Sequence, residues 1–122
     1  MHLTEAERKV MEVLWEQKDG MTAKDIAVEL KNRVGWSKTT SYTMLSRCEG
    51  KQLLHRQEPA YRCSAAITRE QAAEWETDEL LQNNYHGSAD VLVAALVGQK
   101  KLSLKQLEKL YQQLSELEAT AE

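Results

Sequence analysis

The chain has 122 residues, enough for one or two small units, although at this size a second copy would add useful apolar burial. Its composition, with 42% hydrophobic and 29% charged residues, is ordinary for a globular protein, and no apolar run reaches the roughly 20 residues of a membrane-spanning helix. The formal net charge of -3 argues weakly against nucleic acid, and the lack of an Arg-rich presequence favours a soluble, cytoplasmic protein without a membrane partner.

The net charge hides a difference between the two halves of the chain. Residues 1–66 hold eleven Lys and Arg against nine Asp and Glu, whereas residues 67–122 hold five against ten. Residues 31–62 alone hold seven basic side chains and two acidic ones. The positive charge is therefore concentrated in the middle third.

A first helix is expected from Thr4. With Glu7 it has the capping-box spacing, in which each side chain satisfies the other residue's backbone N–H. Apolar residues at helical intervals then continue to about Lys18. Asp19-Gly20 follows as a stop signal, so the helix should end there.

A second helix should begin after Thr22, its expected N-cap, because the apolar positions that follow keep the i, i+3, i+4 spacing. It should end near Gly35, since glycine adopts a left-handed C-terminal turn without a Cβ penalty. Met21, just ahead, is a candidate for a short strand. Ser37 caps a third helix only two or so residues later, which is the order of a helix-turn-helix unit.

The third helix is expected over Ser37 to Lys51, and its two sides differ. Helical spacing puts one set of residues on the buried side: Ser41, Met44, Leu45 and Cys48. The opposite side and its flanks carry small hydroxyls, a Tyr and an Arg but almost no acid: Thr39, Tyr42, Thr43, Ser46, Arg47 and Gly50. A merely solvated helix, the alternative interpretation, would more usually present Lys and Glu there.

A hairpin is expected after the third helix. Two short strand-like runs, Leu53–Gln57 and Tyr61–Ser64, flank a turn at Glu58-Pro59-Ala60. Arg56 and Arg62 lie on either side of that tip. A helix-turn-helix followed by a hairpin is the pattern of a winged helix, in which the hairpin reaches the phosphate backbone beside the groove that receives the third helix.

The rest of the chain should be helical. Thr68 repeats the capping box with Gln71, and the helix it starts should run to about Asn84. Ser88 then caps a short helix that holds the seven consecutive apolar residues Val91–Val97. Because a helix that is apolar all round has no face for water, this one must be enclosed.

A last helix is expected from Ser103, which has the capping-box spacing with Gln106. Four leucines then follow a coiled-coil spacing over less than three heptads: Leu107, Leu110, Leu114 and Leu117. We expect this seam and the Val91–Val97 helix to pack against the same elements of a second chain. A three-helix bundle within one chain is the alternative.

No catalytic constellation is recognisable. The sequence has no Gly-rich phosphate loop, no G-x-S-x-G and no H-E-x-x-H, and its histidines are dispersed: His2, His55 and His86. Its two cysteines form no C-x-x-C pair, and the spacings of Cys48, His55 and Cys63 match no metal-ligand pattern. We therefore expect no enzyme activity, no metal and no cofactor.

The residues resemble a known family. Over nearly its whole length the chain is similar to the penicillinase and methicillin-resistance repressors and their copper-responsive relatives, which are small winged-helix transcriptional repressors of bacteria. The likeness rests on Leu3-Thr4, Val10 to Trp15, Thr22-Ala23 with Ile26, Trp36-Ser37 with Thr40, Thr43, Leu45 and Arg47, Ala60-Tyr61, and Gly87-Ser88 leading into Leu92-Val93.

The resemblance implies a mainly α fold, with a winged helix-turn-helix DNA-binding domain at 1–66 and a three-helix dimerisation domain at 67–122. It also implies a homodimer that binds a dyad-symmetric operator in double-stranded DNA and blocks transcription. By position, Thr40, Thr43 and Arg47 match the recognition helix of the family. Thr hydroxyls can bond phosphates or base edges, and Arg can grip guanine or phosphate with two hydrogen bonds.

Two departures from the family bear on function. Lys38-Thr39 stands where the family often has Pro-Lys, which leaves the operator sequence open. In the antibiotic-responsive members, induction involves proteolysis at an Asn-Phe pair, where this chain has Ala95-Leu96, and the C-x-C pair of the copper-responsive members is absent. Neither inducing mechanism transfers, so an upstream sensor or protease is a candidate partner without an identity.

The expected site residues form two sets. The DNA-binding set is Ser37, Lys38, Thr39, Thr40, Tyr42, Thr43, Ser46 and Arg47, with Lys51, Arg56 and Arg62 to hold phosphates. The dimerisation set is Val91, Leu92, Leu96, Leu107, Leu110, Leu114 and Leu117. A second class of function is a protein-interaction adaptor without specific DNA binding, which the overall acidity and the Leu-rich last helix suggest.

Overall fold

The computed structural model describes residues 1–121, and these form two compact units. One unit is Met1–Glu76 and the other begins at Thr77. The helix α4 (Arg69–Asn84) runs through the point of division. The functional boundary expected after residue 66 stays a prediction, because compactness alone does not assign a function to either part.

The first helix, α1 (Glu5–Trp15), begins with the predicted capping box. The Thr4 backbone N–H donates to the Glu7 carboxylate at 2.8 Å, and the Glu7 N–H donates to the Thr4 hydroxyl at 3.2 Å. The expected end near Lys18 was wrong. The backbone N–H groups of Glu16 and Gln17 turn back to carbonyls three residues earlier, which closes the helix at Trp15.

The next elements follow the predicted order. A strand β1 (Met21–Thr22) precedes α2 (Ala23–Val34), which ends at Gly35 with a φ of 76°. Three residues after Gly35, α3 (Lys38–Gly50) begins, and the hydroxyl of its N-cap Ser37 accepts from the Thr40 backbone N–H at 3.1 Å. The tight turn between α2 and α3 is thus fixed at both of its ends.

The strands β2 (Leu54–Gln57) and β3 (Arg62–Ala65) form the predicted hairpin, and β1 adds to β3 in an antiparallel sheet ordered β1-β3-β2. Each strand begins one residue later than expected, β2 at Leu54 and β3 at Arg62. Ala60 and Tyr61 have φ values of 70° and 47°, so the chain is not extended until Arg62. The hairpin tip is therefore longer than the sequence indicated.

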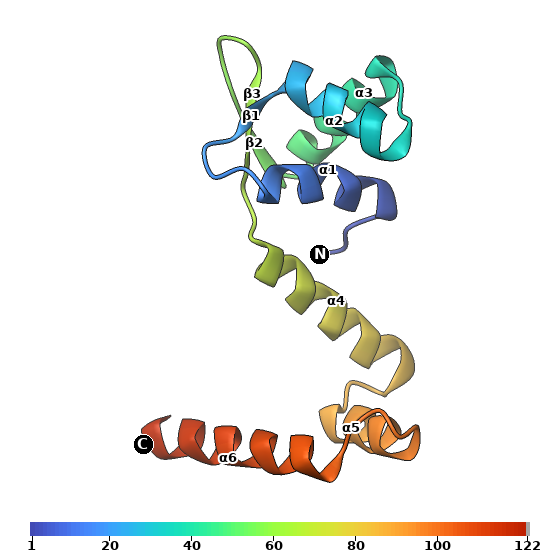
Figure 1. The fold of residues 1–122 in the computed structure, drawn as a ribbon, viewed down its shortest axis with the longest axis vertical. Helices are drawn as coiled ribbons and strands as arrows, with labels where there is room; N and C mark the ends of the chain where they lie inside the picture. Colours follow the sequence, from blue (N-terminus) through green and yellow to red (C-terminus); the bar gives the residue numbers. More distant parts are fainter. Residues whose placement is uncertain (122) are drawn as a thin grey trace. The chain divides into compact units, whose positions relative to one another are not determined.

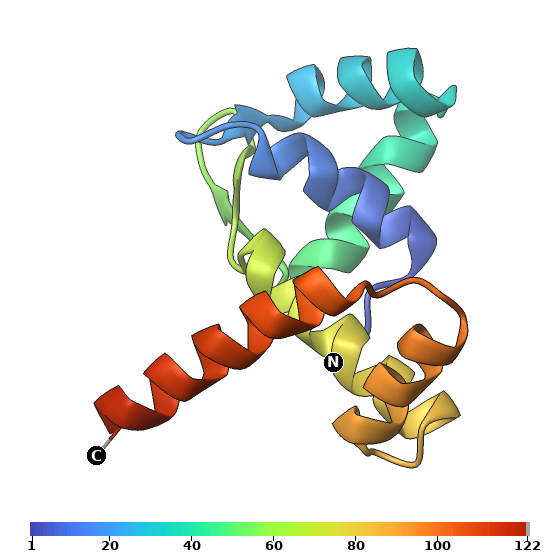
Figure 2. The ribbon, with the colours of Figure 1, turned by 60° about the horizontal axis from the view of Figure 1, so that its bottom comes forward.

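The core of the first unit lies where its three helices meet the sheet. Figure 1 shows α1, α2 and α3 lying against one another with the strands at one side. Figure 2 shows the α2–α3 turn at a corner of this group. The largest buried side chains come from all of these elements and include Met11, Leu14, Ile26, Leu30, Leu45 and Leu53.

The start of α4 is fastened to α1 within the first unit. The Trp15 indole N–H donates to the Ile67 carbonyl at 2.9 Å, and the Arg69 guanidinium meets the Glu12 carboxylate at 2.6 Å. Ala72 is buried here. The first turns of α4 are therefore packed against the rest of the first unit.

The second unit holds the end of α4, α5 (Ala89–Gly98) and α6 (Leu104–Ala121). The capping boxes at Thr68 and Ser103 are confirmed. The cap expected from Ser88 was wrong in its chemistry. Ser88 is the N-cap residue of α5, but its hydroxyl donates to the Asp90 carboxylate and makes no capping bond to a backbone N–H.

Neither α5 nor the described part of α6 contains a buried residue. Residues 1–121 therefore do not form the alternative, a three-helix bundle closed within one chain. The apolar sides of both helices face outward. No described helix is both long enough and apolar enough to cross a membrane. The exposed large apolar side chains of α5 and α6 are Val91, Val93, Val97, Leu104, Leu107, Leu110, Tyr111, Leu114 and Leu117.

Both thiols lie in the core of the first unit. Cys48 and Cys63 have no exposed surface, and burial raises the pKa of Cys48 to about 12 and that of Cys63 to about 11. Among the described residues, no group of three His, Cys, Asp or Glu side chains is placed to hold a metal ion. The thiols are thus inert packing groups at neutral pH.

Candidate nucleic-acid interface

The two sides of α3 divide as the helical spacing predicts. Ser41, Met44, Leu45 and Cys48 are buried against the core, which confirms the expected inner side. On the outer side Thr39, Thr43, Ser46, Arg47 and Gly50 are exposed, and Tyr42 is half-buried. The cap at Ser37 fixes where the helix begins, so core packing and capping together set the direction of the outer side chains.

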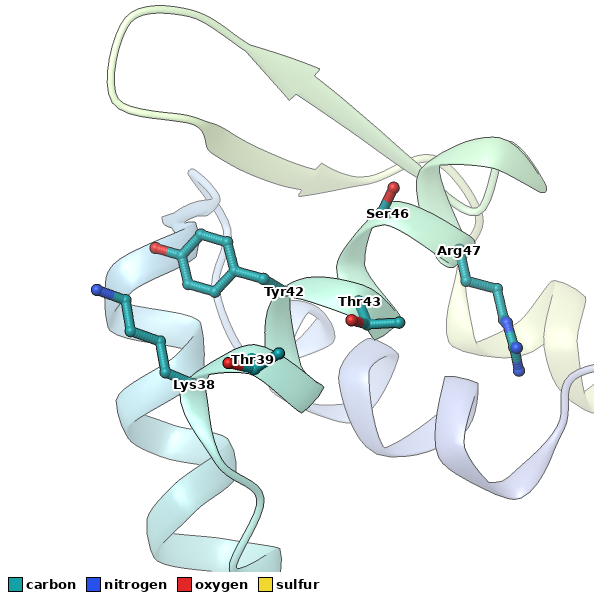
Figure 3. Close-up of a pocket in the computed structure, with 6 residues that line it drawn as sticks. All are labelled: Lys38, Thr39, Tyr42, Thr43, Ser46 and Arg47. Atoms are coloured by element: carbon teal, nitrogen blue, oxygen red, sulfur yellow. The ribbon is translucent and has the colours of Figure 1, made fainter.

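The outer side of α3 forms one continuous, shallow hollow. Its volume is about 670 Å³, and six of the predicted residues line it: Lys38, Thr39, Tyr42, Thr43, Ser46 and Arg47. Figure 3 shows Lys38 and Tyr42 at one end of this row and Arg47 at the other. No acid lines the hollow, so it offers hydroxyls, one phenol and two cations to a ligand.

Two tyrosines connect α3 to the hairpin. The ring of Tyr42 meets the ring of Tyr61 edge to face, with centroids 6.0 Å apart and planes at 87°. The Arg56 guanidinium lies 3.7 Å over the centroid of Tyr61, and the Lys38 ammonium lies 5.8 Å over that of Tyr42. These alternating cation–ring and ring–ring contacts hold the hairpin in position beside α3.

Tyr61 also bonds to α2, because its carbonyl accepts from the Ala23 backbone N–H at 2.8 Å. The role of Tyr61 was missed from the sequence. It lies beside a proline-containing turn, and no local pattern indicates that its ring reaches a tyrosine nineteen positions earlier. The connection depends on the tertiary fold.

The two predicted hairpin arginines are already held by other groups of the chain. Arg56 donates to the Glu58 carboxylate at 2.7 Å, a hydrogen bond that raises the pKa of the guanidinium. Arg62 donates to the carbonyls of Asp19 at 3.2 Å and Gly20 at 3.3 Å. Both side chains stay partly exposed, but neither guanidinium is free to meet a phosphate without giving up a contact.

Lys51 is likewise held inside the protein and apart from the hollow. Its ammonium donates to the Glu7 carboxylate at 2.7 Å and to the His2 carbonyl at 2.9 Å. Glu7 is 1% exposed. Burial alone would raise the pKa of Glu7, but hydrogen bonds from Lys51 and from Thr4 lower it below its ordinary value. Lys51 thus joins the end of α3 to the start of α1.

A family model described as penicillinase repressor matches residues 3–116. The chain belongs to the penicillinase repressor family. This is a family of transcriptional repressors rather than of enzymes, so the chain is a DNA-binding transcriptional repressor. The resemblance read from the sequence is confirmed.

The chain is also similar to several solved structures. The solution structure of the DNA-binding domain of the repressor BlaI is 26% identical, with a TM-score of 0.50, covering 55% of this chain and 83% of that one. A mutant of MepR from S. aureus is 21% identical, with a TM-score of 0.48, covering 98% and 81%. MepR itself, a transcription regulator of the Staphylococcus aureus multidrug efflux pump MepA, is 19% identical, with a TM-score of 0.44, covering 99% and 81%. Curated proteins gave no match.

The remaining predicted residues of the repressor lie at two places. Ser37 and Thr40 are at the start of α3, where the Ser37 hydroxyl donates to the Thr40 hydroxyl at 3.0 Å. The dimerisation set lies on α5 and α6. Leu92 and Leu96 are half-buried, while the other five are 39% to 66% exposed: Val91, Leu107, Leu110, Leu114 and Leu117.

Proposed function

We propose that this repressor is a homodimer that binds a dyad-symmetric operator in duplex DNA by placing α3 in the major groove. The observation that carries the proposal is the hollow on the outer side of α3, which no acid lines, on a helix whose inner side is buried in the core. An α-helix fits the major groove of B-DNA, and hydroxyl, phenol and guanidinium groups match its base edges and phosphates. Two half-sites should then be centred about one DNA turn, roughly 34 Å, or a multiple of it apart.

The proposal assigns residues 1–66 to DNA binding and residues 67–122 to dimerisation. Support for the second assignment is the row of exposed leucines on α6, since monomeric proteins rarely leave such a seam in water. A protein that acts on operator DNA in this way would work in the cytoplasm. A sensor or protease upstream of the repressor is a further proposed partner, and the genes beside its own would indicate which signal it carries.

Within the DNA-binding set, the residues of α3 differ from the three flanking cations. The Arg47 guanidinium makes no hydrogen bond or ion pair within residues 1–121, and with Thr39, Thr43 and Ser46 it lines the hollow that would receive the bases. Arg56 and Arg62 are secondary candidates for phosphate contacts, because binding DNA would replace the contacts that now hold them. The proposal gives Lys51 a mainly structural part.

Arg47→Ala is expected to weaken operator binding by about 1 to 3 kcal/mol, roughly 5- to 150-fold, and to relax selectivity at one operator position. The reason is the loss of a bidentate contact to guanine. Fluorescence anisotropy with a duplex from upstream of its own gene, and with single-base variants of it, measures both effects. Equal weakening on every duplex would instead identify Arg47 as a phosphate contact.

Arg47→Lys is the matched variant, because it keeps the charge and removes the planar fork. If Arg47 reads a base, the lysine variant should lose selectivity much as the alanine variant does. Recovery of full selectivity by lysine would contradict the base-reading role.

A further inference from the structure

The cations of the first unit fall into two groups by what already holds them. Most of them have an acidic or carbonyl partner inside the chain: Arg8, Lys9, Arg33, Lys51, Arg56, Arg62 and Arg69. The ammonium groups of Lys24 and Lys31, both exposed on α2, make no hydrogen bond or ion pair within the described residues, and the same is true of the charged groups of Lys18, Lys38 and Arg47. These two ammonium groups are therefore available to an external anion.

Lys24 and Lys31 lie on the rim of one groove. Its floor is apolar and is formed by Ala27, Val28 and Trp36, where α2 meets the turn into α3. The groove has a volume of about 540 Å³, and no acid lines it. Val28 is 53% exposed, which is high for a valine on a helix that otherwise buries its apolar residues. The groove thus combines a bare apolar floor with a positive rim.

Lys38 makes this groove continuous with the hollow on α3. Its side chain lines both depressions, with the groove on one side and Tyr42 on the other. If the outer side of α3 lies in the major groove of a duplex, the sugar–phosphate backbone that borders that groove would pass close to Lys38. Continuity with the proposed interface, rather than the groove alone, selects the occupant.

We propose that the groove binds the sugar–phosphate backbone beside the bases that α3 reads, with Lys24 and Lys31 as its phosphate contacts. The inference rests on the proposed function and names residues that the sequence did not indicate. Phosphates supply the anions that the rim lacks, and the apolar faces of deoxyribose fit the floor at Val28 and Trp36. Lys24 and Lys31 are seven residues apart, roughly 10 Å along α2, so they meet different phosphates.

The chemistry of this surface predicts a specific signature. Phosphate contacts carry no sequence information, so the groove adds affinity equally on all duplexes. Each neutralised phosphate adds about 0.9 to the slope of log affinity against log salt. The groove therefore acts on salt dependence and register, while the outer side of α3 acts on selectivity.

The test compares the full chain with the double variant Lys24→Gln and Lys31→Gln, by anisotropy on the upstream duplex and on a scrambled duplex over a salt series. The expected result is a slope that falls by about 2 on both duplexes, with the ratio of the two affinities unchanged. Lys105→Gln with Lys109→Gln is the control, since it removes the same charge from α6. The control slope should equal that of the unaltered protein.

A second variant tests the floor without removing a cation. Val28→Glu places a carboxylate on a half-exposed site, so the fold should survive, and affinity should fall on both duplexes while Val28→Thr binds normally. Unchanged binding by Val28→Glu, or an unchanged slope in the lysine double variant, overturns the groove assignment alone. If the unaltered protein binds neither duplex, that result overturns the proposed function and this inference with it.

Discussion

The double variant Leu110→Glu with Leu114→Glu is expected to convert the repressor from a dimer to a monomer and to abolish operator binding at concentrations that saturate the unaltered protein. The two leucines are 49% and 55% exposed in a single chain. In a symmetric dimer four such side chains leave water together, and at about 1.5 kcal/mol each they contribute about 6 kcal/mol. The substitution also brings carboxylates of like charge together.

Analytical ultracentrifugation measures this effect, because a single chain has a mass of 13.9 kDa. Lys105→Glu with Gln112→Glu is the matched control, as these positions lie on the same helix away from the leucine seam. The control should stay dimeric. A leucine variant that still sediments as a dimer would show that the seam is not the interface, and a monomeric unaltered protein would contradict the homodimer itself.

Glu7→Ala is expected to destabilise the DNA-binding unit by about 3 kcal/mol, at the upper end of the usual range for one substitution. Glu7 is buried, and its carboxylate accepts from both the Thr4 N–H and the Lys51 ammonium. Removing it leaves those donors without their acceptor and detaches the end of α3 from α1. Urea unfolding at one fixed protein concentration gives the free energy of unfolding.

Glu5→Ala is the control for Glu7→Ala. Glu5 lies on the same helical turn, but its side chain is 87% exposed and its ion pair with Lys9 is long, at 3.5 Å. The loss should be below about 1 kcal/mol, because exposed ion pairs contribute little. Equal losses for the two variants would contradict a structural role for the buried carboxylate.

The same carboxylate makes stability depend on pH in a defined direction. The folded chain holds the pKa of Glu7 below its ordinary value of 4.5, so the stabilisation is present above that pH and is lost as the pH falls further. Glu7→Gln keeps the shape and stays neutral at every pH. It should therefore be less stable than the unaltered protein at neutral pH, and the difference should narrow in acid.

Much of the fold could be predicted because local rules and the tertiary structure agree. The hydroxyls of Thr4, Thr22 and Ser37 cap helices from fixed positions, and Gly35 ends α2 in a left-handed turn. The inner and outer sides of α3 follow from the 100° step per residue alone. Predictions failed at ends, as at Lys18, where competing hydrogen bonds rather than apolar spacing decide the last turn.

The site was predicted less completely because its contacts join residues distant in sequence. The sequence alone predicts that the basic residues of the hairpin are available for phosphate contacts. In the structure, however, Arg62 donates to carbonyls of residues more than forty positions earlier. Lys24 was overlooked for the opposite reason. In the sequence it is one more solvated lysine on an amphipathic helix, and only the fold shows that it shares a groove with Trp36 and Lys38.

Hydroxyl-radical footprinting of the 122-residue repressor on DNA from upstream of its own gene tests the central claim most directly. Two protected segments related by a dyad are expected, with centres roughly 34 Å or a multiple of that apart on one face of the duplex. The protection should disappear in the Leu110→Glu and Leu114→Glu variant. Protection that is uniform along the duplex, or absent while the protein recovers a protein partner instead, would contradict a dimeric repressor that reads its operator through α3.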